Sequence, residues 1–137
     1  MQKNAGIPDE IKYHAKWKMA LEQYFRAAGN GVVFDWLTFD EGYGSKPLFV
    51  SALAIAKQKF AGEIPKSFAV DGPDGSSRRA DVVLPESKAK KENRYRFKRE
   101  TLSDQVWRAT GKEVMVDGFP MTLVVAQNET SKEVKYF

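Results

Sequence analysis

Hydrophobic residues near the start of the chain recur at steps of three and four, the spacing that predicts an amphipathic helix. The stripe consists of Trp17, Leu21, Tyr24, Phe25 and Ala28. Pro8 and Asp9 suit a first helical turn, where a missing N–H costs nothing and a negative charge meets the positive end of the dipole. Gly29-Asn30-Gly31 favours the left-handed conformation that ends helices. The pattern therefore predicts a helix over residues 9–28.

The next segment predicts a strand, a helix and a second strand. Residues 32–39, VVFDWLTF, are apolar on both alternating faces, as in a strand of a parallel sheet that is covered on both sides. A helical stripe follows over residues 46–59, and residues 60–64 are a second short strand candidate that Pro65 stops. This order predicts a βαβ unit in which the two strands are parallel.

After Pro65 the pattern becomes that of antiparallel β-structure. Residues 71–77 have turn composition, residues 82–84 are a short strand candidate, and residues 85–93 form a charged connector. Further short strands are predicted at 106–108, 113–116, 121–125 and 134–137. Their turns are predicted at Gly111, Asp117-Gly118 and Asn128. The fold class is therefore α/β in the first half and β-rich in the second, α+β overall. The expected division is 1–65 and 66–137, which also fit within a single compact unit.

Length and composition set the remaining bounds. A chain of 137 residues suits one globular domain. It contains no cysteine, which excludes disulfides, thiolate chemistry and a cysteine-ligated zinc site. No apolar run approaches the length of a membrane span, so a cytoplasmic location is the default expectation.

The positive charge of the chain is concentrated in one segment. The net charge is +4, whereas residues 88–99 alone carry seven basic residues and one acid. Such a cluster neutralises phosphates and gives sequence-independent affinity for DNA, although a solvated charged connector is an equally good interpretation. The candidate DNA-binding residues are Lys88, Lys90, Lys91, Arg94, Arg96, Lys98 and Arg99, with Lys46 and Tyr43 as further candidates. Arg94, Arg96 and Lys98 alternate with Tyr95 and Phe97, which predicts an extended conformation.

Asp40 is the candidate catalytic and metal-binding residue. It follows the predicted strand 32–39, and ligands of open α/β sheets bind at the carboxyl ends of strands. Mg²⁺ prefers oxygen ligands, and the glycines at positions 42 and 44 leave room for a close approach. The alternative is that Asp40 is only a turn residue and Glu41 a solvated neighbour.

Three stretches of the sequence resemble bacterial insertion-sequence transposases of the DDE type. They are residues 7–53, FAGEIPKSF at 60–68, and VMVDGFPMTLVVAQNETSKEVKYF at 114–137. The most specific block is WLTFDEGYGSKP, which resembles the second catalytic motif of that family. The resemblance implies a partial RNase H-like core followed by a β-rich insertion. It also implies that Asp40 is the second aspartate of an acidic triad that binds two Mg²⁺ or Mn²⁺ ions and acts on transposon-end DNA.

The same resemblance implies that the chain is an internal fragment. The first aspartate and the glutamate of the triad have no counterpart in it, so the isolated chain is expected to be inactive. A core without its first strands leaves the 32–39 strand with an unpaired edge, which predicts self-association into homo-oligomers. The alternative function is that of a non-catalytic DNA-binding remnant of a decayed transposon, acting through residues 88–99.

A second, weaker nuclease signature lies further along the chain. Asp81, Glu86 and Lys88 superficially match the Asp…Glu-x-Lys pattern of restriction-type nucleases. That pattern requires two acids on adjacent strands, and the short connection and Pro85 disfavour it.

Overall fold

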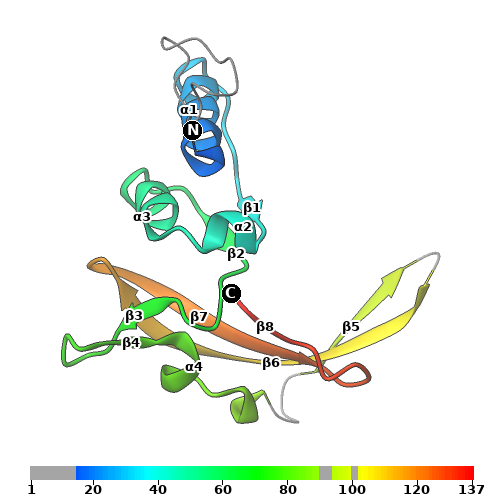
Figure 1. Ribbon diagram of the computed structural model, residues 1–137. Coiled ribbons are helices and arrows are strands. Elements are labelled where there is room, and N and C mark those ends of the chain that lie inside the picture. Colours follow the sequence, from blue (N-terminus) through cyan, green and yellow to red (C-terminus); the bar gives the residue numbers. More distant parts are fainter. Residues whose placement is uncertain (1–14, 90–93, 100–101) are drawn as a thin grey trace, which may run out of the picture. The chain divides into compact units, whose positions relative to one another are not determined.

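The computed structural model describes residues 15–89, 94–99 and 102–137, with only the backbone for 94–99 and 102–104 (Figure 1). The chain forms two compact units, residues 1–34 and 35–137. The division expected at residue 65 falls inside the second unit and stays a prediction.

The first unit contains the helix α1 (Lys16–Gly29). The predicted helix is confirmed from residue 16 onward, whereas residues 9–14 lie outside the described residues. Asn30 ends the helix, and the amide of Val32 donates to the carbonyl of Ala27 at 3.0 Å. Gly31 adopts a positive φ of 89°, which the predicted stop signal requires.

Gly29 offers a direct test of this unit. A Cβ added there meets nothing within 4 Å, and its φ is not positive. We expect Gly29→Ala to stabilise α1 by up to about 1 kcal/mol, because alanine costs less backbone entropy in a helix. Thermal unfolding followed by circular dichroism would measure the change, and a lowered midpoint would contradict it.

The second unit begins with the predicted strand, helix and strand. Strand β1 (Leu37–Phe39) pairs in parallel with β2 (Phe60–Gly62), and α2 (Glu41–Gly44) and α3 (Pro47–Ile55) lie between them in the sequence. The parallel pairing is confirmed. The predicted strand over 32–39 is too long, because β2 supplies only three paired residues and pairing starts at Leu37. The helix ends at Ile55 rather than residue 59, since Lys57 takes a positive φ of 56°.

The remaining strands form an antiparallel sheet with the order β4-β3-β6-β7-β8, and β5 also pairs with β6. The strands are β3 (Ala69–Asp71), β4 (Ser77–Arg79), β5 (Arg94–Arg99), β6 (Leu102–Val116), β7 (Phe119–Asn128) and β8 (Val134–Tyr136). The turn at Asp117-Gly118 is confirmed, with φ of 50° and 79° at its two central residues, as in a type I′ hairpin.

Two local predictions are wrong. No turn occurs at Gly111, because β6 runs through it and pairs with β7 from Trp107 to Val116. Residues 82–84 do not form a strand. Instead the helical turn α4 (Ala80–Val83) buries Ala80 and is followed by buried Leu84, while Val82 stays exposed.

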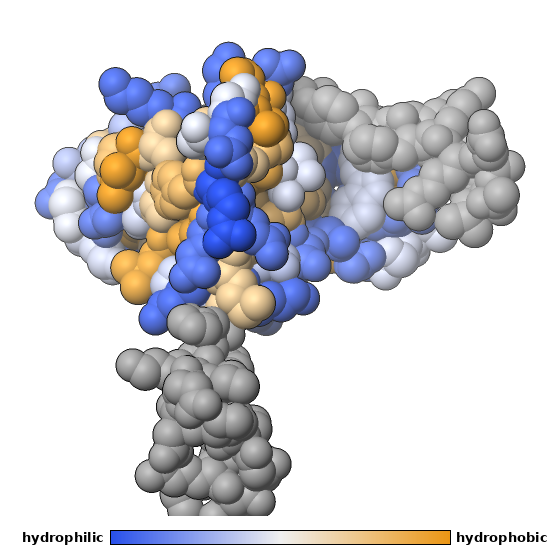
Figure 2. All heavy atoms as spheres, turned by 90° about the horizontal axis from the view of Figure 1, so that it is seen from above, coloured by the Kyte–Doolittle hydropathy of each residue, from blue (hydrophilic) through white to orange (hydrophobic). Residues whose placement is uncertain are grey.

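The core of the second unit joins its helices to the sheet. Its buried residues are Val50, Phe68, Val70, Ala80, Leu84, Ala89, Val114, Val116, Leu123, Val125 and Tyr136. Apolar side chains also reach the surface, among them Trp36, Leu48 and Ile55, and hydrophobic residues are visible on the face shown in Figure 2. The architecture is therefore mixed α/β with a mostly antiparallel sheet. It is consistent with a partial RNase H-like core and a β-rich insertion, as the sequence predicted.

Candidate active site and nucleic-acid interface

Asp40 follows β1 directly and caps the helical turn α2. Its Oδ1 accepts a hydrogen bond from the Gly42 amide at 2.9 Å, and its backbone oxygen accepts from Tyr43 and Gly44 at 3.1 and 3.0 Å. Aspartate suits this position because its side chain satisfies an amide that the helix leaves unpaired. The prediction that Asp40 lies at the carboxyl end of a strand parallel to the one ending near Ile64 is confirmed.

The chemistry of this carboxylate fits a hard cation. Asp40 is exposed, and within the described part of the chain its Oδ2 has no hydrogen-bond partner. Glu41 beside it is exposed as well. Among the described residues, however, no three His, Cys, Asp or Glu side chains gather in a way that holds a metal ion. Asp40 thus offers one oxygen ligand to a divalent ion rather than a complete site.

Two glycines near Asp40, Gly44 and Gly62, allow close packing of the chain around the end of β1. Gly44 is buried, and a Cβ there would overlap the carbonyl oxygen of Glu63. Likewise a Cβ at Gly62 would overlap the ring of Phe39. The backbone carbonyl of Phe39 accepts a hydrogen bond from the Glu63 amide at 3.0 Å. Gly44, predicted to leave room for a ligand, instead makes room for the backbone of Glu63, the residue that follows β2.

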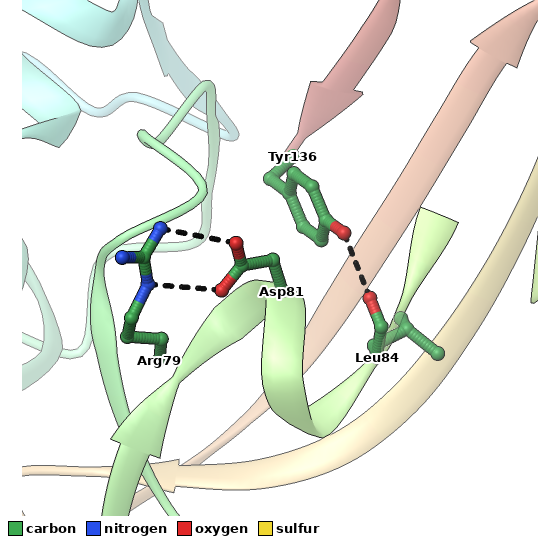
Figure 3. A network of polar contacts seen from close by, with 4 residues as sticks. All are labelled: Arg79, Asp81, Leu84 and Tyr136. Carbon is green, nitrogen blue, oxygen red and sulfur yellow. Dashed lines mark hydrogen bonds and ion pairs between the residues drawn. The ribbon is translucent and has the colours of Figure 1, made fainter. Parts of the chain in front are cut away.

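A charged cleft of about 800 Å³ adjoins this region. Its ionisable lining residues are Glu41, Glu63, Lys66, Arg79, Asp81, Glu86, Lys135 and Tyr136. Arg79 donates two hydrogen bonds to Asp81, at 3.1 and 3.0 Å (Figure 3). Tyr136 donates its hydroxyl to the Leu84 carbonyl at 2.8 Å, and burial raises the pKa of this phenol, so the hydroxyl stays a donor well above neutral pH.

These contacts contradict the restriction-type signature. Asp81 lies in α4 and is paired with Arg79, whereas Glu86 begins a 3-10 turn over Glu86–Lys88. Neither acid is on a strand, so the two cannot form the paired-strand site that this chemistry needs.

The basic segment is described only in part. Lys88 is exposed, and its carbonyl accepts from the Thr110 hydroxyl at 2.8 Å. Lys90 and Lys91 lie outside the described residues. Arg94, Arg96, Lys98 and Arg99 all belong to β5, which confirms the extended conformation predicted there. For these four residues the structure describes only the backbone.

Strand β5 and the first half of β6 form a two-stranded arm, defined as residues 94–99 and 102–108. β5 pairs with β6 between Leu102 and Arg108, whereas β7 pairs with it only from Trp107 onward (Figure 1). Arg108 at the base of the arm forms an ion pair with Glu129 at 2.7 Å.

The two further candidates for DNA contact differ in exposure. Lys46 is exposed at the start of α3. Tyr43 is half-buried, and its ring lies 5.4 Å from that of Phe49.

The sequence pattern of the DDE superfamily endonucleases matches residues 1–115. The chain belongs to this family. Membership supports a nuclease or transposase type of function on DNA, and DDE superfamily endonucleases generally use divalent metal ions. Asp40 and β5 both lie within the matched region.

Two other comparisons give no match, one with curated proteins and one with solved structures. Among the described residues of the chain, no helix has the length and apolar character needed to cross a membrane.

Proposed function

We propose that this chain forms part of an insertion-sequence transposase of the DDE type, which catalyses Mg²⁺- or Mn²⁺-dependent cleavage and transfer of DNA strands. Asp40 acts as one carboxylate ligand of its divalent-metal centre. The observation that carries the proposal is the position of this exposed carboxylate at the end of β1, beside the parallel strand β2.

The residues around Asp40 orient its carboxylate for metal binding. The Gly42 amide holds Oδ1, which fixes the direction of the other oxygen. A bound divalent ion would supply charge neutralisation at the phosphate oxygens that are attacked and released. The resemblance to DDE transposases assigns no other residue of this chain to the acidic triad, and the isolated chain is therefore proposed to be inactive.

DNA is the proposed macromolecular partner, held through its phosphates by the basic segment at 88–99. A two-stranded β-ribbon fits the major groove of B-DNA, and the arm has this form. Lys46 and Tyr43, near Asp40 in sequence, are proposed as further contacts. The division into a catalytic core at 1–65 and an insertion at 66–137 belongs to the same proposal.

A non-catalytic DNA-binding remnant is the second candidate function. It is favoured by the absence of a gathered ligand set among the described residues, whereas the basic strand β5 is formed. Binding of Mn²⁺ and of DNA to this chain separates the two. The proposed enzyme requires paramagnetic broadening of amide signals near Asp40 that Asp40→Asn removes. The remnant requires only DNA binding that depends on Arg94–Arg99.

Self-association remains a prediction. Among the described residues β1 has one partner strand, β2, and its other edge is unpaired. Such an edge and the exposed side chains of Trp36, Leu48 and Ile55 favour pairing with a second copy. We expect the sedimentation coefficient to rise with protein concentration in the micromolar range. A single monomeric species throughout that range would contradict this expectation.

A further inference from the structure

We infer that the antiparallel sheet positions Asp40, through β8 and the backbone of Glu63-Ile64, and that Gly44 and Tyr136 are the positioning residues. This inference rests on the proposed function of Asp40 as a metal ligand. Its evidence is a continuous series of contacts within the second unit, from the capped turn α2 to the core of the sheet.

The first contact fixes α2 against the segment that follows β2. Gly44, the last residue of α2, is buried, and a Cβ there would overlap the carbonyl group of Glu63 and crowd the side chain of Ile64. Backbone cannot move aside as a flexible side chain does, so no residue with a Cβ fits at position 44 without displacing α2. The turn that Asp40 caps therefore lies where Glu63-Ile64 places it.

The second contact joins Glu63-Ile64 to β8. The Ile64 amide donates to the carbonyl of Tyr136 at 2.8 Å, in an antiparallel bridge outside the regular strands. Lys135 adds an ion pair with Glu63 at 3.6 Å. That pair is partly exposed and contributes little stability by itself, so the backbone bridge is the main connection.

The third contact anchors β8 in the core. Tyr136 is only 4% exposed, and its hydroxyl donates to the carbonyl of Leu84, which is equally buried. Figure 3 shows the ring of Tyr136 directed from β8 toward this carbonyl. β8 pairs with β7, which pairs with β6, the strand that carries the arm. The sheet thus holds the basic strand and the segment that supports Asp40 in one packed unit.

The consequence for function is a fixed geometry between DNA and carboxylate. A duplex bound along the arm and a metal ion held by Asp40 would both be fixed to the same sheet. Removing the hydrogen bond of Tyr136 should therefore make the turn at Asp40 less rigid, although the tyrosine contacts neither DNA nor metal in this proposal.

The test uses the 137-residue chain and hydrogen exchange measured by NMR. The amides of Gly42, Tyr43 and Gly44 all donate to Asp40 and report on its turn. Tyr136→Phe removes the hydroxyl that holds Leu84, and we expect exchange at these three amides to accelerate about fivefold, the effect of one lost hydrogen bond. Thr110→Val is the control for loss of a hydroxyl donor to a backbone carbonyl at the same 2.8 Å distance, in a hydrogen bond that is exposed where that of Tyr136 is buried. The inference is overturned if Tyr136→Phe changes the three amides no more than Thr110→Val does.

Gly44→Ala tests the first contact independently. We expect it to shift the amide resonances of residues 40–44 and to accelerate their exchange, with Gly29→Ala as the control for a glycine replaced in open space. Unchanged resonances in a folded Gly44→Ala chain would overturn the inference. If Gly44→Ala does not fold, the exchange measurement on Tyr136→Phe still tests the inference.

Mn²⁺ separates failure of the inference from failure of the proposed function. In the wild-type chain, Mn²⁺ should broaden the amides of residues 40–42, and Asp40→Asn should remove the effect. Absence of this broadening counts against the proposed function alone, since the exchange measurements contain no metal. If broadening occurs, Tyr136→Phe should weaken it and Thr110→Val should not.

Discussion

Asp40→Asn is expected to abolish DNA strand cleavage in a full-length transposase that contains this chain, while DNA binding remains almost unchanged. The amide keeps the shape of the side chain and its acceptor for the Gly42 amide, but it loses the negative charge that holds a cation. Mutating even the outer partners of a metal site typically costs 10- to 100-fold, so loss of a direct ligand should cost more than about a hundredfold. Cleavage of labelled transposon-end DNA in Mg²⁺ measures the rate.

Glu41→Gln provides the matched control for this substitution. Glu41 is the adjacent acid and is exposed, but it does not cap α2. It should retain most of the cleavage activity, because the proposed ligand is Asp40 alone. Cleavage by Asp40→Asn at the wild-type rate would mean that this aspartate serves only the turn that the structure shows it capping.

The elements that were predicted correctly are those defined by local chemistry. The stop signal Gly29-Asn30-Gly31 and the hairpin at Asp117-Gly118 depend on backbone conformations that few other residues adopt. The parallel pairing of β1 and β2 follows from a strand, helix and strand in close succession. The position of Asp40 at the end of β1 follows from the same pattern.

The errors concern features that distant segments decide. Gly111 has the composition of a turn, but ten consecutive pairs with β7 carry the strand through it. Val82-Val83-Leu84 has strand propensity, yet one helical turn buries Ala80 and places Leu84 in the core, where its carbonyl also meets Tyr136. Propensity at these positions is weaker than tertiary pairing and packing.

The surroundings of Asp40 were predicted less well than Asp40 itself. The Gly-Tyr-Gly stretch was interpreted as space for a ligand, whereas Gly44 accommodates the backbone of Glu63. Nothing local to Tyr136 indicates that its carbonyl bridges to Ile64, since these residues are far apart in the sequence. In the sequence only Gly44 signals this packing. A glycine can mark a position where another segment of backbone comes close, but it does not reveal which segment that is.

Neutralising the basic strand should have the opposite effect to Asp40→Asn. Replacing Arg94, Arg96 and Lys98 together with glutamine is expected to weaken DNA binding and to leave the metal ligand intact. If each side chain neutralises one phosphate, the slope of log K against log salt should fall by up to about three. With about 0.9 units of slope per phosphate the change is about 2.7, which at 0.1 M salt, relative to 1 M, corresponds to a loss of affinity of up to about 500-fold. Fluorescence anisotropy with a labelled duplex across a salt series measures both quantities.

A second triple variant controls for the loss of overall charge. Lys57, Lys59 and Lys132 are exposed and lie outside the basic segment, so replacing them with glutamine removes the same three charges. Its salt slope should stay close to that of the wild type, because these lysines are not proposed to meet phosphates. Equal losses of affinity and slope in the two variants would show that DNA responds to net charge alone. In that case the duplex does not bind along β5, and the arm has no special part in DNA binding.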